Sequence, residues 1–377
     1  MKSMNTQMPL RVPITILFLF VLLLSACQAL EPSQAAQADS PPAVEQESTA
    51  VVPAQEVVEE QEAPAEPVEA EPVEAEQEAS DEPQLATAIA SAKLTNQAGR
   101  AIVSARGNHF IVDSVPPIEG PNEELNPLDM MLGALATCGM FIAEHVAQEE
   151  AMPLEDVLVD VEGDLDASGV AGSGADPRLQ VMRVHLDLPG TNDEQAAQIV
   201  ENFEARCPIY TTLTRATEIE ITVNDETPSA ATEGLNTAKL SAQLSNQPGR
   251  AIVSARGNHF VIDSVPPLEG PNEERNPLDL ILGSLATCGT FIFERSAQEM
   301  DIPLTSINTL VEGDFDPRGV GAMGSIDPRI QAFRVKIETE GIDDAQAELM
   351  TEQFQQRCPI YTTLQHAAPI DIAVTTN

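Results

Sequence analysis

The stretch that decides the fold is Asn126-Pro-Leu-Asp-Met-Met-Leu-Gly-Ala-Leu-Ala-Thr-Cys138, which recurs as Asn276-Pro-Leu-Asp-Leu-Ile-Leu-Gly-Ser-Leu-Ala-Thr-Cys288. Each copy predicts the start of a buried helix. Asn126 is a favoured N-cap residue, Pro127 suits the first helical position, and Asp129 falls in the first turn, where the helix dipole favours negative charge. Apolar residues then continue on nearly every side to Cys138, which predicts a helix in the centre of a fold.

A second motif follows each helix. It reads Arg206-Cys-Pro-Ile-Tyr-Thr-Thr-Leu213 and returns as Arg357-Cys-Pro-Ile-Tyr-Thr-Thr-Leu364. Upstream, Gly99–Phe110 is identical to Gly249–Phe260. The offset of 150 residues, with one inserted residue in a glycine-rich loop, is too long for a solenoid repeat. The sequence therefore predicts a duplicated domain, 86–224 and 237–377, joined by the linker 225–236.

Within one copy, the pattern predicts strands and helices in a mixed order. We expect a meander of three short strands, Lys93–Asn96, Arg100–Ala105 and His109–Val115, followed by the buried helix from Pro127 to about Glu149 and two further strands. An amphipathic helix from about Asn192 to Cys207, a helical turn and a closing strand complete the repeat. The segment 166–176 between the two middle strands reads as a loop. Strand groups interrupted by helices without βαβ alternation predict an α+β fold.

The charge of the chain is strongly acidic and unevenly distributed. The net charge is −41, and residues 28–84 hold sixteen Asp or Glu with no Lys or Arg. The remainder, 85–377, still carries 44 acidic against 17 basic residues. A nucleic-acid-binding surface needs a basic footprint, so this composition argues against nucleic acid as a partner.

The N-terminus resembles a bacterial lipoprotein signal. Residues 1–27 contain Lys2 and Arg11, an apolar run too short for a spanning helix, and Leu24-Ser-Ala-Cys27, in which Cys27 is the expected lipidation site. An uncleaved anchor or plain secretion is the alternative. The acidic Pro/Ala/Glu segment 28–85 has no aromatic residue and predicts a disordered spacer. The folded part is then expected in the cell envelope, on the non-cytoplasmic side of a membrane.

The repeated motifs resemble the OsmC/Ohr family of thiol-dependent hydroperoxide reductases. The Asn-Pro-Leu-Asp helix ending at Cys138 and the later Cys207-Pro motif carry this resemblance, supported by Asp113-Ser-Val-Pro-Pro before the helix. It implies two domains that intertwine, with sheets wrapped around paired central helices. Because one chain holds both copies, the expectation is an intramolecular pseudo-dimer with two sites.

The resemblance also implies a two-cysteine mechanism. Cys138 and Cys288 would attack an organic hydroperoxide, Cys207 and Cys358 would resolve the sulfenic acids to disulfides, and an external dithiol, a protein or a small molecule, would reduce them. No bound cofactor is expected. A cation should lower the pKa of the attacking thiol. Arg100 and Arg250, or Arg106 and Arg256, are the candidates, and the family comparison favours the first pair.

One position departs from the hydroperoxide-resistance branch of that family. That branch has Glu directly after Asn-Pro, where it holds the Arg, whereas this chain has Leu128 and Leu278. The carboxylates stand one residue on, at Asp129 and Asp279. They could hold the Arg, or they could serve only as capping charges at the helix start.

Two other interpretations of the cysteines stay open from the residues alone. They could form permanent disulfides in an oxidising compartment, or remain inert buried thiols. The protein would then be a non-catalytic envelope domain that binds small apolar molecules or protein partners. Metal binding is not expected, because His109 and its counterpart His259 are the only histidine shared by both copies.

Overall fold

The computed structural model describes residues 83–321 and 326–377. The predicted signal sequence, the lipidation site Cys27 and nearly all of the acidic segment lie outside these residues. These three features therefore stay predictions from the sequence.

Two long helices occupy the centre, α1 (Pro127–Glu149) and α5 (Pro277–Glu299), and they pack against each other. The side chain of Asn126 accepts hydrogen bonds from the N–H groups of Leu128 and Asp129, and Asp129 accepts one from the N–H of Asn126 at 2.9 Å. This reciprocal capping box explains why the helix begins where the sequence predicts. Both helices are long and apolar enough to cross a membrane, but 89% and 94% of their most apolar windows are buried inside the fold, as expected of core helices.

The elements of the two repeats follow the same order. The first repeat forms β1 (Ala86–Leu94), β2 (Arg100–Ala105), β3 (Asn108–Asp113), η1 (Pro116–Ile118), α1, β4 (Leu158–Leu165), α2 (Ala167–Val170), β5 (Val181–Asp187), α3 (Asp193–Arg206), α4 (Pro208–Leu213) and β6 (Glu218–Val223). The second forms β7 (Asn236–Leu244), β8 (Arg250–Ala255), β9 (Asn258–Asp263), η2 (Pro266–Leu268), α5, β10 (Ser306–Phe315), α6 (Arg318–Gly321), β11 (Ala332–Glu340), α7 (Asp344–Arg357), α8 (Pro359–Leu364) and β12 (Ile370–Thr376). The predicted α+β fold class is confirmed.

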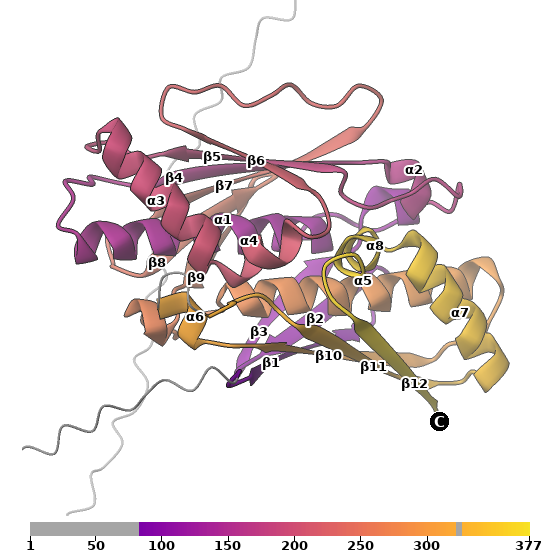
Figure 1. The fold of residues 1–377 in the computed structure, drawn as a ribbon. Coiled ribbons are helices and arrows are strands. Elements are labelled where there is room, and N and C mark those ends of the chain that lie inside the picture. Colours follow the sequence, from indigo (N-terminus) through magenta and orange to yellow (C-terminus); the bar gives the residue numbers. More distant parts are fainter. Residues whose placement is uncertain (1–82, 322–325) are drawn as a thin grey trace, which may run out of the picture. The chain divides into compact units, whose positions relative to one another are not determined.

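The two sheets exchange strands between the repeats. One has the order β12-β11-β10-β1-β2-β3 and the other β6-β5-β4-β7-β8-β9. Each meander therefore completes the sheet of the opposite repeat, through antiparallel pairing of β1 with β10 and of β7 with β4. Figure 1 shows α1 and α5 between the two sheets. This is the intertwined pseudo-dimer that the family resemblance implies.

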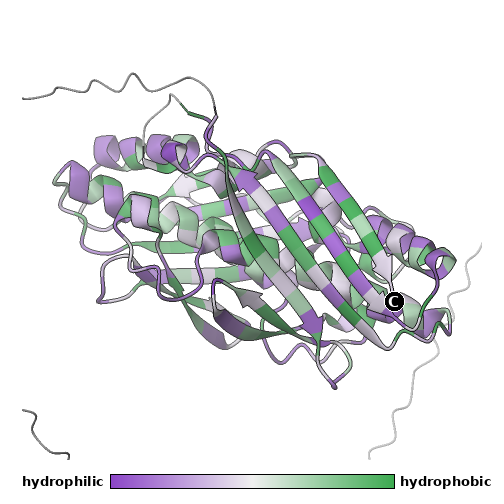
Figure 2. Ribbon diagram, turned by 90° about the horizontal axis from the view of Figure 1, so that it is seen from below, coloured by the Kyte–Doolittle hydropathy of each residue, from purple (hydrophilic) through white to green (hydrophobic). Residues whose placement is uncertain are grey.

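Each sheet turns one face toward the central helices. Along β10 and β11 buried residues alternate with more exposed ones, and Figure 2 shows the matching alternation of hydrophobic and hydrophilic residues. A period of two with one buried face is what an antiparallel sheet on a core requires. The fold thus places the cysteine-bearing helices in the most protected layer.

Two local predictions were wrong. The strand predicted from Lys93 begins at Ala86, because its first residues pair with β10 of the other repeat and not with a neighbour in sequence. The predicted loop 166–176 contains the short helix α2. Its N-cap is Asp166, whose side chain accepts a hydrogen bond from the N–H of Ser168.

Candidate functional site

The four cysteines of the repeats form two disulfides, each within one repeat. Cys138 of α1 is bonded to Cys207, with 6.0 Å between their Cα atoms. Cys288 of α5 is bonded to Cys358 in the same way, at 5.9 Å. These are the pairs that the family resemblance implies.

Local sequence brings the two cysteines together. Pro208 disfavours a helical conformation at the residue before it, so Cys207 is extended and lies between α3 and α4. Its sulfur accepts a hydrogen bond from the N–H of Tyr210 at 3.2 Å. On α1, Gly139 leaves room for the ring of Phe203, since a Cβ atom there would stand 2.9 Å from it. Helix α3 can therefore pack close enough to α1 for the sulfurs to meet.

The two members of each pair differ in accessibility. Cys138 and Cys288 are 5% and 4% exposed, whereas Cys207 and Cys358 are fully buried. The helix cysteine of each pair lines a cavity: one of about 550 Å³ at Cys138 and one of about 30 Å³ at Cys288. A small molecule would therefore reach the helix cysteine first.

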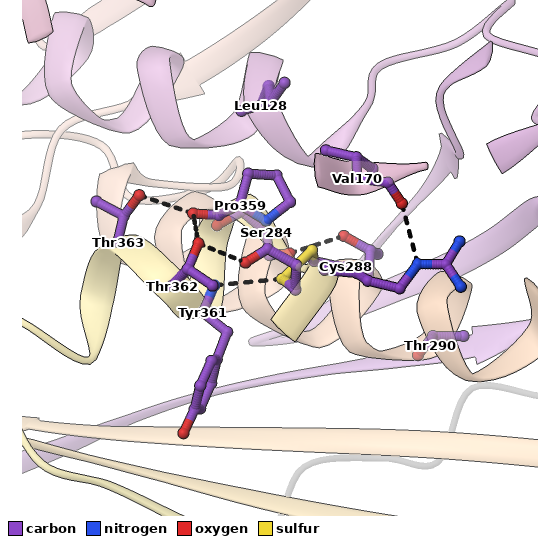
Figure 3. Close-up of a disulfide and its surroundings, with 12 residues drawn as sticks. Leu128, Val170, Ser284, Cys288, Thr290, Pro359, Tyr361, Thr362 and Thr363 are labelled. Carbon is purple, nitrogen blue, oxygen red and sulfur yellow. Dashed lines mark hydrogen bonds between the residues drawn. A yellow bond between two sulfur atoms is a disulfide. The ribbon is translucent and has the colours of Figure 1, made fainter. Parts of the chain in front are cut away.

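Both repeats contribute to each site. Around Cys138, the first repeat supplies Phe141 and Pro208, while Leu278 and Val320 come from the second. At the other site the contributions are reversed. Figure 3 shows Leu128 and Val170 of the first repeat beside the disulfide of Cys288.

An arginine from the opposite repeat binds the acid at the start of each central helix. Arg106 and Asp279 line the Cys138 cavity, and Nη2 and Nε of Arg106 donate to Oδ2 of Asp279 at 2.7 and 2.9 Å. Arg256 donates to Asp129 in the same way, at 2.6 and 3.1 Å. Each acid also completes a capping box. The question that the sequence left open is therefore answered: Asp129 and Asp279 do both.

The backbone explains how Arg106 reaches the site. It stands in the two-residue turn between β2 and β3 with φ 51°, followed by Gly107 with φ 87°. Two residues with positive φ are the signature of a tight turn between twisted antiparallel strands. Further bonds to the carbonyl oxygens of Asn272, at 3.1 Å, and Glu274, at 2.6 Å, fix the guanidinium against the second repeat.

Neither Arg100 nor Arg250 is among the described residues that line the two cavities, whereas Arg106 lines the larger one. The described lining of the smaller cavity contains no arginine. Nε of Arg100 donates to Oδ1 of the fully buried Asp113 at 2.6 Å. Burial raises the pKa of Asp113, but hydrogen bonds from Arg100 and two backbone N–H groups outweigh it and hold that pKa below its usual range. Arg250 and Asp263 repeat this ion pair, which anchors the segment before each central helix.

The arginine before the second cysteine has a role that the sequence did not predict. Arg206, only 2% exposed, donates from Nε to the carbonyl oxygen of Val320 at 2.9 Å, and from Nη1 to Glu149 at 3.0 Å. Arg357 likewise donates to Val170, at 3.1 Å. Each therefore ties the cysteine pair to a cavity-lining turn of the opposite repeat. Its place in the repeated Arg-Cys-Pro motif was the available signal.

The repeated histidine and tyrosine lie in structural positions. His109 is at an exposed strand edge, where its Nδ1 lies 2.8 Å from Oγ of Ser104. The ring of Tyr210 packs 5.0 Å from that of Phe203. The described residues contain no cluster of three His, Cys, Asp or Glu side chains able to hold a metal ion.

Comparison with known proteins gives the family. Residues 120–222 and 270–373 match the family model described as OsmC-like protein. These two matches span more than half of the chain, so the protein belongs to the OsmC-like family and carries its domain twice. A search of curated proteins finds no match.

Several solved structures are similar to one copy of the domain. An OsmC-like protein from Mycoplasma pneumoniae is 18% identical, with 37% of this chain and 96% of that chain covered and a TM-score of 0.31. An organic hydroperoxide resistance protein OsmC from Legionella pneumophila is 18% identical, with 36% and 96% covered and a TM-score of 0.29. An organic hydroperoxide resistance protein from Elizabethkingia anophelis is 18% identical, with 37% of this chain and 96% of that chain covered and a TM-score of 0.30.

Proposed function

We propose that this protein is a thiol-dependent peroxidase that reduces organic hydroperoxides through its two cysteine pairs. One observation carries the proposal: a helix cysteine at an apolar cavity is bonded to a fully buried cysteine, and an arginine lines the same cavity. This arrangement separates a thiol that meets substrate from one that only its partner can reach.

The reaction requires one cysteine pair, the hydroperoxide and an external dithiol. The Cys138 thiolate attacks the terminal oxygen of the hydroperoxide, the O–O bond breaks, and the alkoxide leaves as the alcohol after taking a proton. Cys138 is then a sulfenic acid. The Cys207 thiolate attacks that sulfur, the S–O bond breaks, hydroxide leaves and takes a proton to become water, and the disulfide seen in the structure forms. An external dithiol, a protein or a small molecule, returns two electrons by thiol–disulfide exchange.

Arg106 is the residue to which we assign thiolate stabilisation at Cys138, and Arg256 is its counterpart. A cation beside a thiol favours the charged nucleophile. The bidentate contact with Asp279, itself only 2% exposed, fixes the orientation of the guanidinium. Asp279 is therefore a positioning residue. We give Arg100 no role in the chemistry, because its contacts are with Asp113 and Glu123.

The lipoprotein-like N-terminus supports an envelope location for the proposed reaction. The predicted lipidation of Cys27 would hold the catalytic part on the non-cytoplasmic side of a bacterial membrane, at the end of the acidic spacer. Mass spectrometry of the purified N-terminus tests this: we expect a diacylglyceryl group on Cys27, and a Cys27→Ser variant should be released from membranes. An unmodified N-terminus would contradict the anchor.

The activity is tested on the reduced chain beginning at Gln28. One equivalent of methyl hydroperoxide, small enough for both sites, is added, and thiol loss is followed by quenched mass spectrometry. We expect two thiols to be lost per oxidised pair, much faster than from free cysteine. The Cys138→Ser variant should abolish the loss at Cys207 but not at Cys288. Oxidation no faster than that of free cysteine would leave the disulfides as structural cross-links of a non-catalytic envelope domain.

A further inference from the structure

The two sites of the chain are unequal, although their cysteine motifs are repeated. The cavity at Cys138 measures about 550 Å³, within the range of about 300–1,000 Å³ typical of small-molecule sites. The cavity at Cys288 measures about 30 Å³. That is room for about one or two water-sized groups.

A hydrogen bond near the Cys288 site has no counterpart at the Cys138 site. Each cavity is covered by the short helix of the opposite repeat, α2 over Cys288 and α6 over Cys138. The N–H of Ala167, the first residue of α2, donates to Oδ1 of Asn236 on β7 at 3.2 Å. The counterparts are Pro317, which has no N–H, and Ala86, which has no side-chain acceptor. The second repeat therefore cannot form this bond.

The two residues that lack the bond are themselves part of the larger cavity. Ala86 and Pro317 both line it, together with Phe315 at the end of β10. The counterpart of Phe315 is Leu165, which is only 2% exposed and packs into the core. The extra volume at Cys138 thus lies between β1 and the start of α6, where the opposite site is closed.

The rim of the larger cavity is apolar as well. Ile89 lines it and is 46% exposed. The counterpart, Lys239, donates from its Nζ to Glu162 at 2.5 Å on the outer face of its sheet. An exposed isoleucine next to an apolar cavity favours an occupant whose carbon skeleton continues past the cysteine.

From these differences we propose a division of labour between the pairs. The Cys138 site takes hydroperoxides with a bulky or extended apolar group, and the Cys288 site admits only the smallest peroxides. The assignment of substrates rests on the proposed peroxidase function, whereas the difference in accessible space does not.

Size-graded alkylation of the full reduced chain tests the difference without any peroxide. Iodomethane is the small reagent and N-(1-pyrenyl)maleimide the bulky one, with labelling of each cysteine followed by peptide mass spectrometry. We expect the small reagent to label both helix cysteines at similar rates, and the bulky reagent to label Cys138 at least about tenfold faster than Cys288. Equal rates with the bulky reagent would overturn the proposal.

Matched variants are made by exchanging, between the repeats, the residues that form or prevent this hydrogen bond. Ala86→Asn with Pro317→Ala should slow bulky labelling of Cys138, and Asn236→Ala with Ala167→Pro should accelerate it at Cys288. Thermal unfolding of each variant shows whether the fold is kept. If the rate of labelling by the bulky reagent is unchanged in both folded variants, the hydrogen bond is not the cause of the difference between the sites.

The same chain, with one pair at a time changed to serine, is then treated with hydrogen peroxide and with cumene hydroperoxide. We expect both pairs to react with the first and only the Cys138 pair to react rapidly with the second. Equal preference in the two pairs would overturn the division of substrates. No reaction with either peroxide, alongside unequal alkylation, would refute the peroxidase function while leaving the two cavities unequal.

Discussion

Nη2 of Arg106 lies 2.7 Å from Oδ2 of Asp279, and the two residues belong to different repeats. The reverse contact joins Arg256 to Asp129. Each site is therefore assembled only when both repeats are folded. A turn of one repeat and the start of a central helix in the other must meet for the guanidinium to be held.

Loss of Arg106 should slow Cys138 and leave Cys288 unchanged. Without the cation, the thiolate of reduced Cys138 would lose the stabilisation that we propose, and we expect Arg106→Met to cut the oxidation rate about tenfold at neutral pH. Arg256→Met is the matched control and should affect only Cys288. The rate lost in Arg106→Met should return as pH is raised. A loss that persists at high pH would indicate a structural role.

Half of the chain should not fold as a monomer. A fragment of residues 83–235 contains β1–β3 but lacks β10. In the intact chain β1 pairs with β10, with Ala86 opposite Phe315. The fragment does contain β4, which pairs with β7 in the intact chain, with Leu165 opposite Asn236. Because β1 is the counterpart of β7, β1 of one fragment can pair with β4 of another in the same register. Two fragments can therefore exchange meanders. Light scattering should show a dimer, and a stable folded monomer would contradict the exchange.

The disulfides should stabilise the fold independently of any catalytic role. Cys138 and Cys207 are 69 residues apart, and the loop-entropy model gives about 4 kcal/mol for a loop of this length. We expect the reduced chain to unfold at lower urea concentration than the oxidised one. Double variants with serine at both members of one pair should behave like the reduced protein for that pair. Identical midpoints would show that the reduced chain gains compensating interactions.

Stability should rise and then fall as the pH is lowered from neutral. Burial raises the pKa of Glu144 and of Glu294, so protonation of these groups favours the folded state. That stabilisation is complete below the unfolded pKa and is lost as pH rises through the folded one. Glu144→Gln with Glu294→Gln should remove the rise. The free energy of unfolding, measured with urea at a series of pH values from neutral downward, tests this.

At still lower pH, protonation of carboxylates in ion pairs should destabilise the fold. Hydrogen bonds from Arg318 lower the pKa of Asp316 to about 2, and the pKa of Asp113 is also below its usual range. The stability that these carboxylates contribute is present above the unfolded value, about pH 4, and is lost as pH falls through the folded pKa. Unfolding free energies that keep increasing below about pH 3 would contradict these ion pairs.

Arg275, which is half-buried, offers a test of the asymmetry between the two repeats. Its guanidinium lies 4.6 Å from the ring centroid of Phe110, and its buried Nε has no hydrogen-bond partner among the described residues. The counterpart Leu125 is 4% exposed. We expect Arg275→Leu to stabilise the protein by about 1 kcal/mol, because an unsatisfied group costs more than the cation–π contact returns. Leu125→Arg is the reciprocal control and should destabilise it.

The parts of the fold that depend on local sequence could be predicted. Helix α1 begins and ends as expected, because Asn126 and Pro127 fix its start and its apolar run is continuous. Contacts between repeats could not be read from spacing. The first residues of β1 are extended through pairing with β10. Asp129 stands 127 residues from Arg256, and nothing in the sequence distinguishes Arg256 from Arg250 as its partner.

The linker between the repeats has a consequence for how the two sites can change. In a dimer of two identical chains, every mutation enters both sites, so neither site can lose an ability that the other keeps. Here each codon specifies one position in only one half. Pro317 can stand where the other half has Ala167, and Arg275 where it has Leu125. Joining the halves in one polypeptide frees each site to specialise while its twin retains the original task.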